Sequence, residues 1–318
     1  MIDSTQSGER VRKRIEALGT TISLPTVRRA LGSLEGEHAS NRRFGSDDVM
    51  DIRAYIPGDE ARLIDWKTSA RAGRPMVVQR ERLVTSRVWM LLDVGREMQG
   101  SCPSGEHAYE VAANALCMFA ALSLKRSDDV SLVFGNSSSI VRIPFHGGLA
   151  QFEHTLDTAL AHDWHEPRNI DALLHYARRL RDRNALIILA TDEHAITQRH
   201  LPAIRAIAQT HPLVVIDVAT LNPFMPRAAH ALDGVTLRRV PAFLKTPATA
   251  NEVSTHREFM ATALHRELTS YGSTLIRSDS SDAMFTHVIR IVSASAGRFK
   301  LANLSPSSPA PTPGGGDQ

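Results

Sequence analysis

From residue 88 onward, hydrophobic residues fall into short unbroken runs separated by longer segments in which apolar positions recur at helical spacing. Short continuous runs of this kind are typical of strands buried on both faces of a sheet. Strands are predicted on this basis for residues 88–94, 130–134, 139–143, 185–191, 213–218 and, at an edge of the sheet, 235–240. The turn signal Gly135-Asn136 predicts that the second and third of these form a hairpin.

Segments of helical periodicity alternate with these strands. Helices are predicted for residues 106–126, 149–160, 170–181, 198–209, 256–271 and 282–291. Strands that alternate with helices form βαβ units, which give a mostly parallel sheet flanked by helices. The predicted fold class is therefore α/β and Rossmann-like. Ligands bind beyond the carboxyl ends of the strands in such folds, which is where Asp93 and Asp192 lie.

The pattern divides the chain into three parts. Residues 1–87 are an N-terminal extension, residues 88–300 the α/β domain, and residues 301–318, rich in Pro, Ser and Gly, a tail expected to be disordered. The longest apolar run, residues 111–124, is shorter than the roughly 20 residues of a membrane span, so it predicts a buried helix. Cys117 in this run is expected to be a buried free thiol. A free thiol and the absence of a signal-peptide pattern together predict a cytoplasmic location.

Composition and charge narrow the function only slightly. Hydrophobic residues make up 42% and charged residues 22% of the chain, which is ordinary for a globular protein, and the formal net charge is +3. Residues 1–87 hold 16 Lys and Arg against 12 Asp and Glu, so the positive charge gathers there. This local excess is too weak to predict nucleic-acid binding.

Two short basic segments remain candidates for nucleic-acid binding, residues 10–14 and the pair Arg28-Arg29. Val11 and Ile15 give the first segment the spacing of an amphipathic helix with a solvated basic face. We favour the helix, so nucleic acid is not an expected partner.

Common catalytic signatures are absent from the sequence. It has no GxxxxGK[ST] loop, no GxGxxG after the first predicted strand, no HExxH and no GxSxG. The motifs therefore indicate no enzyme class.

Residues 53–74 bring acidic, basic and aromatic side chains unusually close together after the turn signal Pro57-Gly58. Asp59 and Asp65 can pair with the arginines of the same segment, which are Arg62, Arg71 and Arg74. Trp66 is expected to anchor the segment against the core. These contacts predict an ion-pair network that ties the extension to the α/β domain, and we favour it over a binding surface.

The same segment resembles the signature of a bacterial family, domain of unknown function 58. That signature is Tyr-x-Pro-Gly-Asp-x-x-Arg-x-Ile-Asp-Trp-x-x-Ser-Ala-Arg-x-Gly, matched nearly position for position by residues 55–73. The residues that carry the resemblance are Tyr55, Pro57, Gly58, Asp59, Arg62, Asp65, Trp66, Ser69 and Arg71. The resemblance implies a von Willebrand factor A-like domain from about residue 88. It also implies a MoxR-type AAA+ ATPase as partner, with the signature segment bracing the domain or docking the ATPase.

The resemblance has a further implication for the strand ends. von Willebrand factor A-like domains often hold a divalent cation through Asp-x-Ser-x-Ser, a later Thr and a final Asp, together called a metal-ion-dependent adhesion site. Asp93, Glu97, Asn169 and Asp192 stand in the corresponding places here, whereas Gly95 supplies no ligand. Mg²⁺ and Mn²⁺ favour such oxygen ligands.

These departures leave two interpretations of the rim. The four residues can form a remodelled Mg²⁺ or Mn²⁺ site, or a degenerate site that keeps its geometry without a metal. In the second case Arg96 is a candidate to neutralise the carboxylates. We favour the degenerate site, so no cofactor is expected.

Three functions are carried forward. The favoured one is a non-enzymatic protein-interaction module, an adaptor or substrate-presenting partner of a MoxR-type AAA+ ATPase in chaperone-like assembly or remodelling. Its strand-end rim would contact another protein. One alternative is a metal-dependent hydrolase that activates water at the acidic rim. The other is nucleic-acid binding through the basic N-terminal segment, which would weaken steeply with salt.

Overall fold

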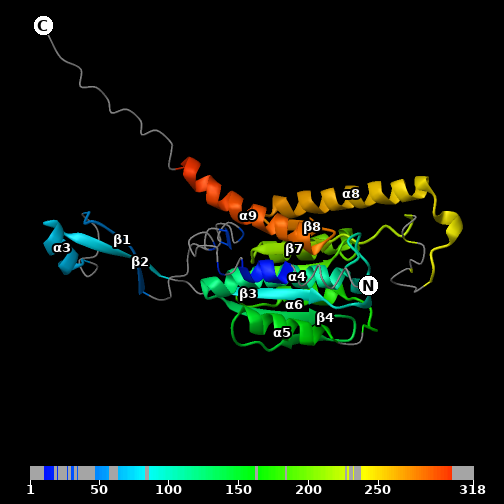
Figure 1. The fold of residues 1–318 in the computed structure, drawn as a ribbon, viewed down its shortest axis with the longest axis horizontal. Helices are drawn as coiled ribbons and strands as arrows, with labels where there is room; N and C mark the ends of the chain where they lie inside the picture. Colours follow the sequence, from blue (N-terminus) through cyan, green and yellow to red (C-terminus); the bar gives the residue numbers. More distant parts are fainter. Residues whose placement is uncertain are drawn as a thin grey trace, which may run out of the picture.

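A computed structural model gives the fold of the chain (Figure 1). The residues that it describes are 11–17, 20, 27, 30–31, 34, 47–56, 64–82, 86–161, 164–182, 185–225, 228, 232 and 238–302. Side chains are described in these ranges except for residues 47–53, 78–82 and 295–302.

The centre of the molecule is a six-stranded sheet in the order β5-β4-β3-β6-β7-β8. Its strands are β3 (Arg87–Asp93), β4 (Asp129–Gly135), β5 (Ile140–Ile143), β6 (Leu186–Asp192), β7 (Leu213–Val218) and β8 (Thr274–Ser278). All neighbours are parallel except β4 and β5, which form the predicted hairpin. The strand order reverses between β3 and β6, so the carboxyl ends of these two strands form the switch point at which doubly wound folds bind ligands.

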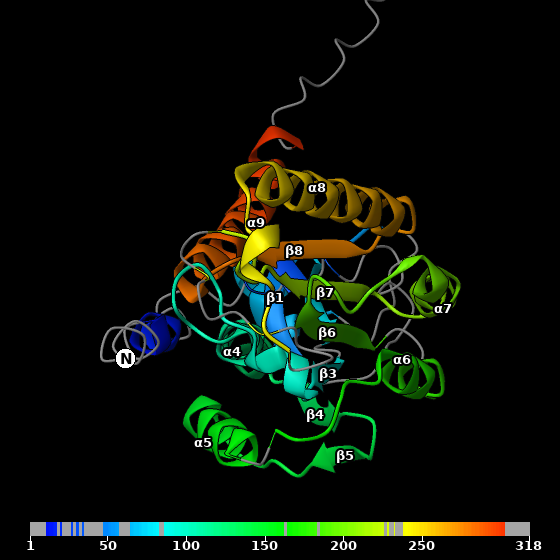
Figure 2. The same cartoon turned by 90° about the vertical axis from the view of Figure 1, so that its right-hand side faces the viewer.

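Helices cover both faces of this sheet (Figure 2). The α-helices of this domain are α4 (Ala108–Arg126), α5 (Leu149–Leu160), α6 (Ile170–Arg178), α7 (Leu201–Ala208), α8 (Pro247–Ser270) and α9 (Ser281–Ala302). Short 3₁₀ helices are η3 (Arg96–Gln99), η4 (Gln198–His200) and η6 (Ala242–Leu244). α4, α5 and α9 lie on one side of the sheet, α6 and α7 on the other, and α8 lies over the edge strand β8. The predicted α/β fold class is therefore confirmed.

Side-chain alternation along the strands divides the core into two layers. Val88, Met90 and Leu92 of β3 pack with α4, whereas Trp89 and Leu91 face the α6 and α7 side. α4 is buried over most of its length because it lies beneath α5 and α9. Both cysteines are buried and free, which confirms the prediction for Cys117.

The described residues of the N-terminal region pack onto this domain. Val11 and Ile15 are buried in the same apolar layer as α4. Arg12 donates to Asp157 at 3.0 Å and also hydrogen-bonds Asn114 on α4. Arg14 pairs with Asp282, and its guanidinium lies 4.2 Å from the ring centroid of Phe285. Two of the candidate nucleic-acid-binding arginines are thus engaged with the domain itself.

A small unit lies beyond the end of the sheet at which β3 begins (Figure 1). It consists of the antiparallel strands β1 (Asp47–Ala54) and β2 (Met76–Arg82), with α3 (Trp66–Ala72) between them in sequence. We call the described residues 47–56 and 64–82, which hold these elements, the projecting unit. It contains the described part of the signature segment.

The main differences from the sequence prediction lie at the edges of the sheet. β8 was not predicted, because its side chains are only partly covered and give no continuous apolar run. The expected strand at residues 235–240 is represented by one bridge between Leu232 and Arg239, and residues 233–237 lie outside the described chain. α8 begins nine residues before the predicted start at residue 256. In the described part of the chain, we find no helix with the length and apolar content that crossing a membrane requires.

Candidate functional site

The carboxyl ends of β3 and β6 bring three acids together around one arginine. Asp93 ends β3, Asp192 ends β6, and Glu97 lies on η3. Arg168, in the loop before α6, reaches all three. We call these four residues the acidic rim.

The Arg168 guanidinium contacts each carboxylate. Its Nη1 donates to Asp192 Oδ1 at 2.7 Å, and its Nη2 pairs with the other oxygen of the same group. Its Nε lies 3.7 Å from Asp93 Oδ2 and 3.8 Å from Glu97 Oε2. The Arg168 backbone N–H also donates to Glu97 Oε2, at 2.9 Å. This bidentate pairing with Asp192 is the geometry that suits a guanidinium best.

Asp93 is the most deeply buried member of the rim. Its carboxylate accepts hydrogen bonds from the Gly95 N–H at 2.9 Å and from the Thr191 hydroxyl at 2.8 Å. Burial raises the pKa of Asp93 to about 6, although the nearby Arg168 opposes this shift.

The loops that carry Gly95 and Arg168 are in very close contact. A Cβ at Gly95 would lie 2.5 Å from the backbone N and Cα of Arg168, so no larger residue fits there without a shift. Arg96 N–H donates to the carbonyl of Glu166 at 2.8 Å, which holds the same two loops together. The position of Gly95, noted in the sequence only as a missing ligand, therefore permits the approach of Arg168.

Two expectations for the rim change with this geometry. Asn169 accepts a hydrogen bond from Ala172 N–H at 3.0 Å and so caps the N-terminus of α6. Arg168, and not Arg96, supplies the guanidinium that lies among the three carboxylates. In the part of the chain that the structure describes, no group of three or more His, Cys, Asp or Glu residues is arranged to hold a metal ion.

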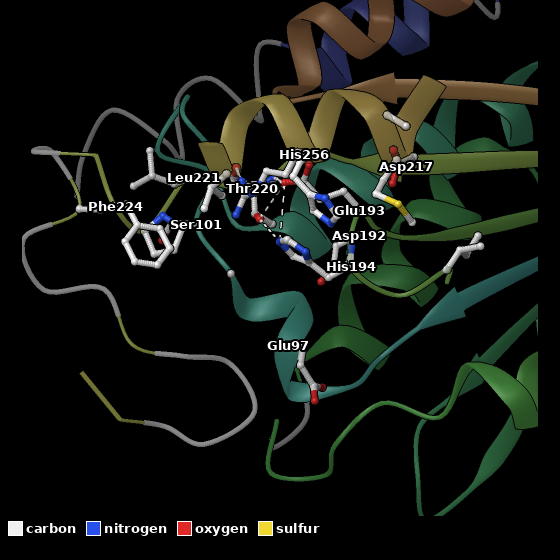
Figure 3. Close-up of a pocket in the computed structure, with 18 of the residues that line it drawn as sticks. Glu97, Ser101, Asp192, Glu193, His194, Asp217, Thr220, Leu221, Phe224 and His256 are labelled. Carbon is white, nitrogen blue, oxygen red and sulfur yellow. Dashed lines mark hydrogen bonds and ion pairs between the residues drawn. The ribbon is translucent and has the colours of Figure 1, made fainter. Parts of the chain in front are cut away.

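A cavity of about 1240 Å³ opens beside the acidic rim, beneath α8 (Figure 3). Its lining includes the apolar side chains of Leu221, Phe224, Met260 and Leu264. It also includes charged groups at the ends of β6, β7 and β8. Such a mixture of apolar surface and a few fixed polar groups is typical of binding sites.

Glu193 is a charged group of this cavity whose two carboxylate oxygens both accept hydrogen bonds. Its Oε1 accepts from Thr220 N–H at 2.9 Å and from Arg257 Nη1 at 3.0 Å. Its Oε2 accepts from Arg277 Nη2 at 2.5 Å. The side chain of Glu193 is only 3% exposed, so this network joins the end of β6 to α8 and β8 in a water-poor environment.

Asp217 of β7 lines the same cavity with a different environment. Its closest charged partner is Arg277, whose Nε lies 3.7 Å away, and no hydrogen bond reaches its carboxylate among the described residues. Burial raises the pKa of Asp217 to about 7, and the neighbouring carboxylates of Glu193 and Asp192 add to this shift. Arg277 lowers it.

The signature residues that the structure describes have mainly structural contacts. Asp65 caps α3 by accepting from Lys67 N–H at 2.9 Å and from Thr68 N–H at 3.2 Å. Ser69 Oγ donates to the carbonyl of Asp65 at 2.6 Å and accepts from Met76 N–H at 2.8 Å, which ties α3 to β2. The expected ion pairs of Asp59 with Arg62 lie outside the described residues, as do Pro57 and Gly58.

Trp66 does not anchor the segment. Its side chain is 71% exposed, so the expectation that it packs against the core is wrong. The capping of α3 by Asp65 places Trp66 at the first position of the helix. The projecting unit also exposes Tyr55 and Ile56, while Arg71 lies in the last turn of α3.

A Ser69→Ala variant is expected to loosen the projecting unit without unfolding the α/β domain. It leaves the partly buried Met76 N–H without this acceptor, which costs at most about 1 to 3 kcal/mol. Hydrogen exchange at the Met76 amide should become roughly 5- to 100-fold faster. Thr68→Ala is the matched control, because the Thr68 hydroxyl contacts Asp65 and not Met76. Equal exchange in both variants would contradict this role of Ser69.

Sequence comparison places the chain in a family. Residues 51–223, more than half of the chain, match the family described as "Protein of unknown function DUF58". The chain belongs to this family. The match covers most of the projecting unit, from residue 51, and the strands that carry the acidic rim.

The chain is similar to curated proteins from mycobacteria. Uncharacterized protein Rv1480 of Mycobacterium tuberculosis (strain ATCC 25618 / H37Rv) and uncharacterized protein Mb1516 of Mycobacterium bovis (strain ATCC BAA-935 / AF2122/97) are each 25% identical to it over 210 residues. The match covers 64% of this chain and 65% of each relative, so the chain spans less than two thirds of their length.

Among solved structures, the chain is similar to the SpRpn10 VWA domain. The TM-score is 0.36 with 9% sequence identity, and the match covers 65% of this chain and 95% of that domain. The fold described above rests on the strand order and directions of the sheet itself.

The sequence indicated only part of this site. Asp93 and Asp192 were found because each ends an apolar run. Asp217 carried the same kind of signal, as a single acid within the run 213–218. Arg168 and Arg277 carried none, because each meets its acidic partner only through the fold.

Proposed function

We propose that this chain is a non-catalytic protein-interaction module that serves as an adaptor or substrate-presenting partner of a MoxR-type AAA+ ATPase. The ATPase is proposed from the family resemblance of the signature segment. This proposal rests mainly on two separate features, a cavity with apolar lining and a group of exposed apolar side chains. They lie at opposite ends of the sheet (Figure 1).

The first surface is the cavity beside the acidic rim. Its lining offers the apolar side chains of Leu221 and Phe224, together with charged groups such as Arg257 that hydrogen-bond to Glu193. A cavity of about 1240 Å³ exceeds the usual size of a small-molecule site. It suits a segment of a partner protein with apolar side chains.

The second surface is the projecting unit. Trp66, Ile56 and Tyr55 are all exposed there, on a unit that lies beyond the far end of the sheet (Figure 1). Exposed tryptophan and tyrosine are the side chains that contribute most often to protein interfaces. Because the two surfaces are separated by the length of the sheet, one partner can occupy each at the same time, as an adaptor requires.

The rim geometry disfavours the metal-dependent hydrolase. Water activation at the rim needs carboxylate oxygens that are free to bind a metal. Arg168 already donates to Asp192 and lies within 4 Å of both Asp93 and Glu97. The nucleic-acid alternative is disfavoured by the ion pairs that Arg12 and Arg14 form with the domain.

The test is recovery of the ATPase with tagged full-length chain from native cells under ATP-trapping conditions, followed by mass spectrometry. Trp66→Ala should lower the recovery about tenfold, because a central tryptophan commonly contributes that much to an interface. Its thermal stability should not change, since the side chain is 71% exposed.

Phe259→Ala is the matched control, because Phe259 on α8 is an aromatic side chain of similar exposure, 67%, away from the projecting unit. Recovery of no AAA+ ATPase by the wild-type chain would refute the proposed partner. Equal losses in Trp66→Ala and Phe259→Ala would refute docking through the projecting unit.

A further inference from the structure

We propose that the Arg168 guanidinium is the built-in cation of the acidic rim, in the place where a metal-ion-dependent adhesion site holds a divalent ion. Contact between the rim and a partner would therefore need no metal. The second statement rests on the proposed function, whereas the first concerns the free chain alone.

The carboxylates of Asp192 and Asp93 already accept hydrogen bonds from the protein. Asp192 receives both terminal nitrogens of Arg168 and, at 2.8 Å, the backbone N–H of His194. Asp93 receives Gly95 N–H and the Thr191 hydroxyl. A divalent ion needs several of these oxygens at about 2.1 Å in near-octahedral arrangement, and it would have to displace N–H donors to obtain them.

The charges of the rim also favour Arg168 over a divalent ion. Three carboxylates at one strand edge repel one another unless a cation lies among them. Arg168 supplies a positive charge in contact with all three, and a guanidinium stays charged at any physiological pH. The residues present therefore do not fit a divalent ion while Arg168 remains in place.

The backbone fixes Arg168 in this position. Its N–H donates to Glu97, and its Cα lies against Gly95 so closely that even a methyl group there would meet it at 2.5 Å. A long side chain anchored only at a surface could swing away and admit an ion. Here the backbone of Arg168 is itself packed against the rim, and its side chain is only 15% exposed.

This arrangement changes how a partner can be recognised. A metal in an adhesion site keeps one coordination position open for a carboxylate of the partner. Arg168 directs an N–H of each terminal nitrogen to Asp192, and a guanidinium has no open coordination position that a partner's carboxylate could occupy. Recognition then depends on shape and on the cavity next to the rim, and not on a metal-bridged acid.

The test begins with Mn²⁺ as the probe, titrated into the wild-type full chain and followed by electron paramagnetic resonance of the free ion. No site is expected below about 1 mM, the range in which protein sites for hard cations function. One Mn²⁺ bound per chain in that range, and lost in Asp93→Asn, would overturn the proposal.

Two variants test the role of the charge. Arg168→Met keeps the length of the stem and removes the charge, and its unfolding equilibrium constant should rise by about 100-fold or more. Arg168→Lys keeps a charge but loses the bidentate geometry, so its rise should be at least about tenfold smaller than that of Arg168→Met. Equal losses in both would overturn the proposal, because the stem and not the cation would then matter. If Arg168→Met does not fold, the wild-type titration and Arg168→Lys still decide.

Metal-free recognition of the partner is tested in a separate experiment. ATPase recovered by the wild-type chain should be unchanged within about twofold by EDTA, since the rim needs no divalent ion. The nucleotide-trapped ATPase carries its own Mg²⁺, so EDTA is applied to the captured chain before the ATPase is added back. EDTA-sensitive capture would overturn metal-free recognition. Failure of all capture would refute the proposed function and leave the Mn²⁺ result standing.

Discussion

Replacement of Glu193 by glutamine is expected to lower the free energy of unfolding by roughly 3 to 5 kcal/mol, the usual cost of breaking a buried ion pair. The carboxylate is 3% exposed and accepts from Thr220, Arg257 and Arg277. The substituted amide would keep the size of the side chain but would turn an NH₂ group toward one set of these donors. Two arginines would also lose the charge that compensates them in a water-poor site.

Urea unfolding followed by the fluorescence of the chain's tryptophans measures this loss, and Trp89 is a buried reporter in the core next to β6. Glu252→Gln is the matched control, because Glu252 on α8 also lines the cavity but is exposed to solvent. Its effect should stay within about 0.5 kcal/mol. A Glu193→Gln variant as stable as this control would show that the network contributes nothing to the fold.

The strands could be predicted because each central one carries its own signal. β3, β6 and β7 are covered on both faces, so they appear in the sequence as unbroken apolar runs. β8 lies at the edge beneath α8 and is only partly buried, so Thr274–Ser278 shows no such run. The prediction therefore failed where tertiary contacts, and not the local pattern, decide the structure.

The site was harder to predict than the strands, because tertiary contacts decide most of its geometry. The acids at strand ends are local features, so Asp93 and Asp192 were found. Their cation comes from Arg168, whose approach depends on a glycine about 70 residues away, and no spacing in the sequence records that contact. Trp66 was misplaced because the acids and arginines around it suggested an ion-pair network, whereas Asp65 serves as a helix cap.

Glu193 and Asp217, two buried acids of the cavity, differ in one respect that decides their energetics. Glu193 has hydrogen-bond donors on both oxygens, whereas the Asp217 carboxylate has none among the described residues. A buried charge is tolerated when donors replace the water that it loses, and it is costly when they do not. The same neutralising change should therefore destabilise the protein at one position and stabilise it at the other.

Asp217→Asn is accordingly expected to stabilise the protein at pH 8 by as much as roughly 4 kcal/mol. The pKa of Asp217 is raised to about 7 in the folded state from its ordinary value of 3.8, because burial disfavours the charged form. Folding therefore binds a proton between these two values, and wild-type stability falls as the pH rises from about 4 to about 7. The asparagine has no charge to bury, so the gain should be small near pH 4 and complete above pH 7.

Urea unfolding of the wild type and the variant at pH 5 and pH 8 isolates this contribution, because the other groups facing Asp217 are common to both chains. Those groups are Arg277 on β8 and the carboxylates of Glu193 and Asp192. Asp279→Asn is the matched control, since this exposed acid follows β8 and should give no pH-dependent gain. If Asp217→Asn were equally stabilising at both pH values, the gain would come from packing, and the carboxylate of Asp217 would not carry the cost assigned to it.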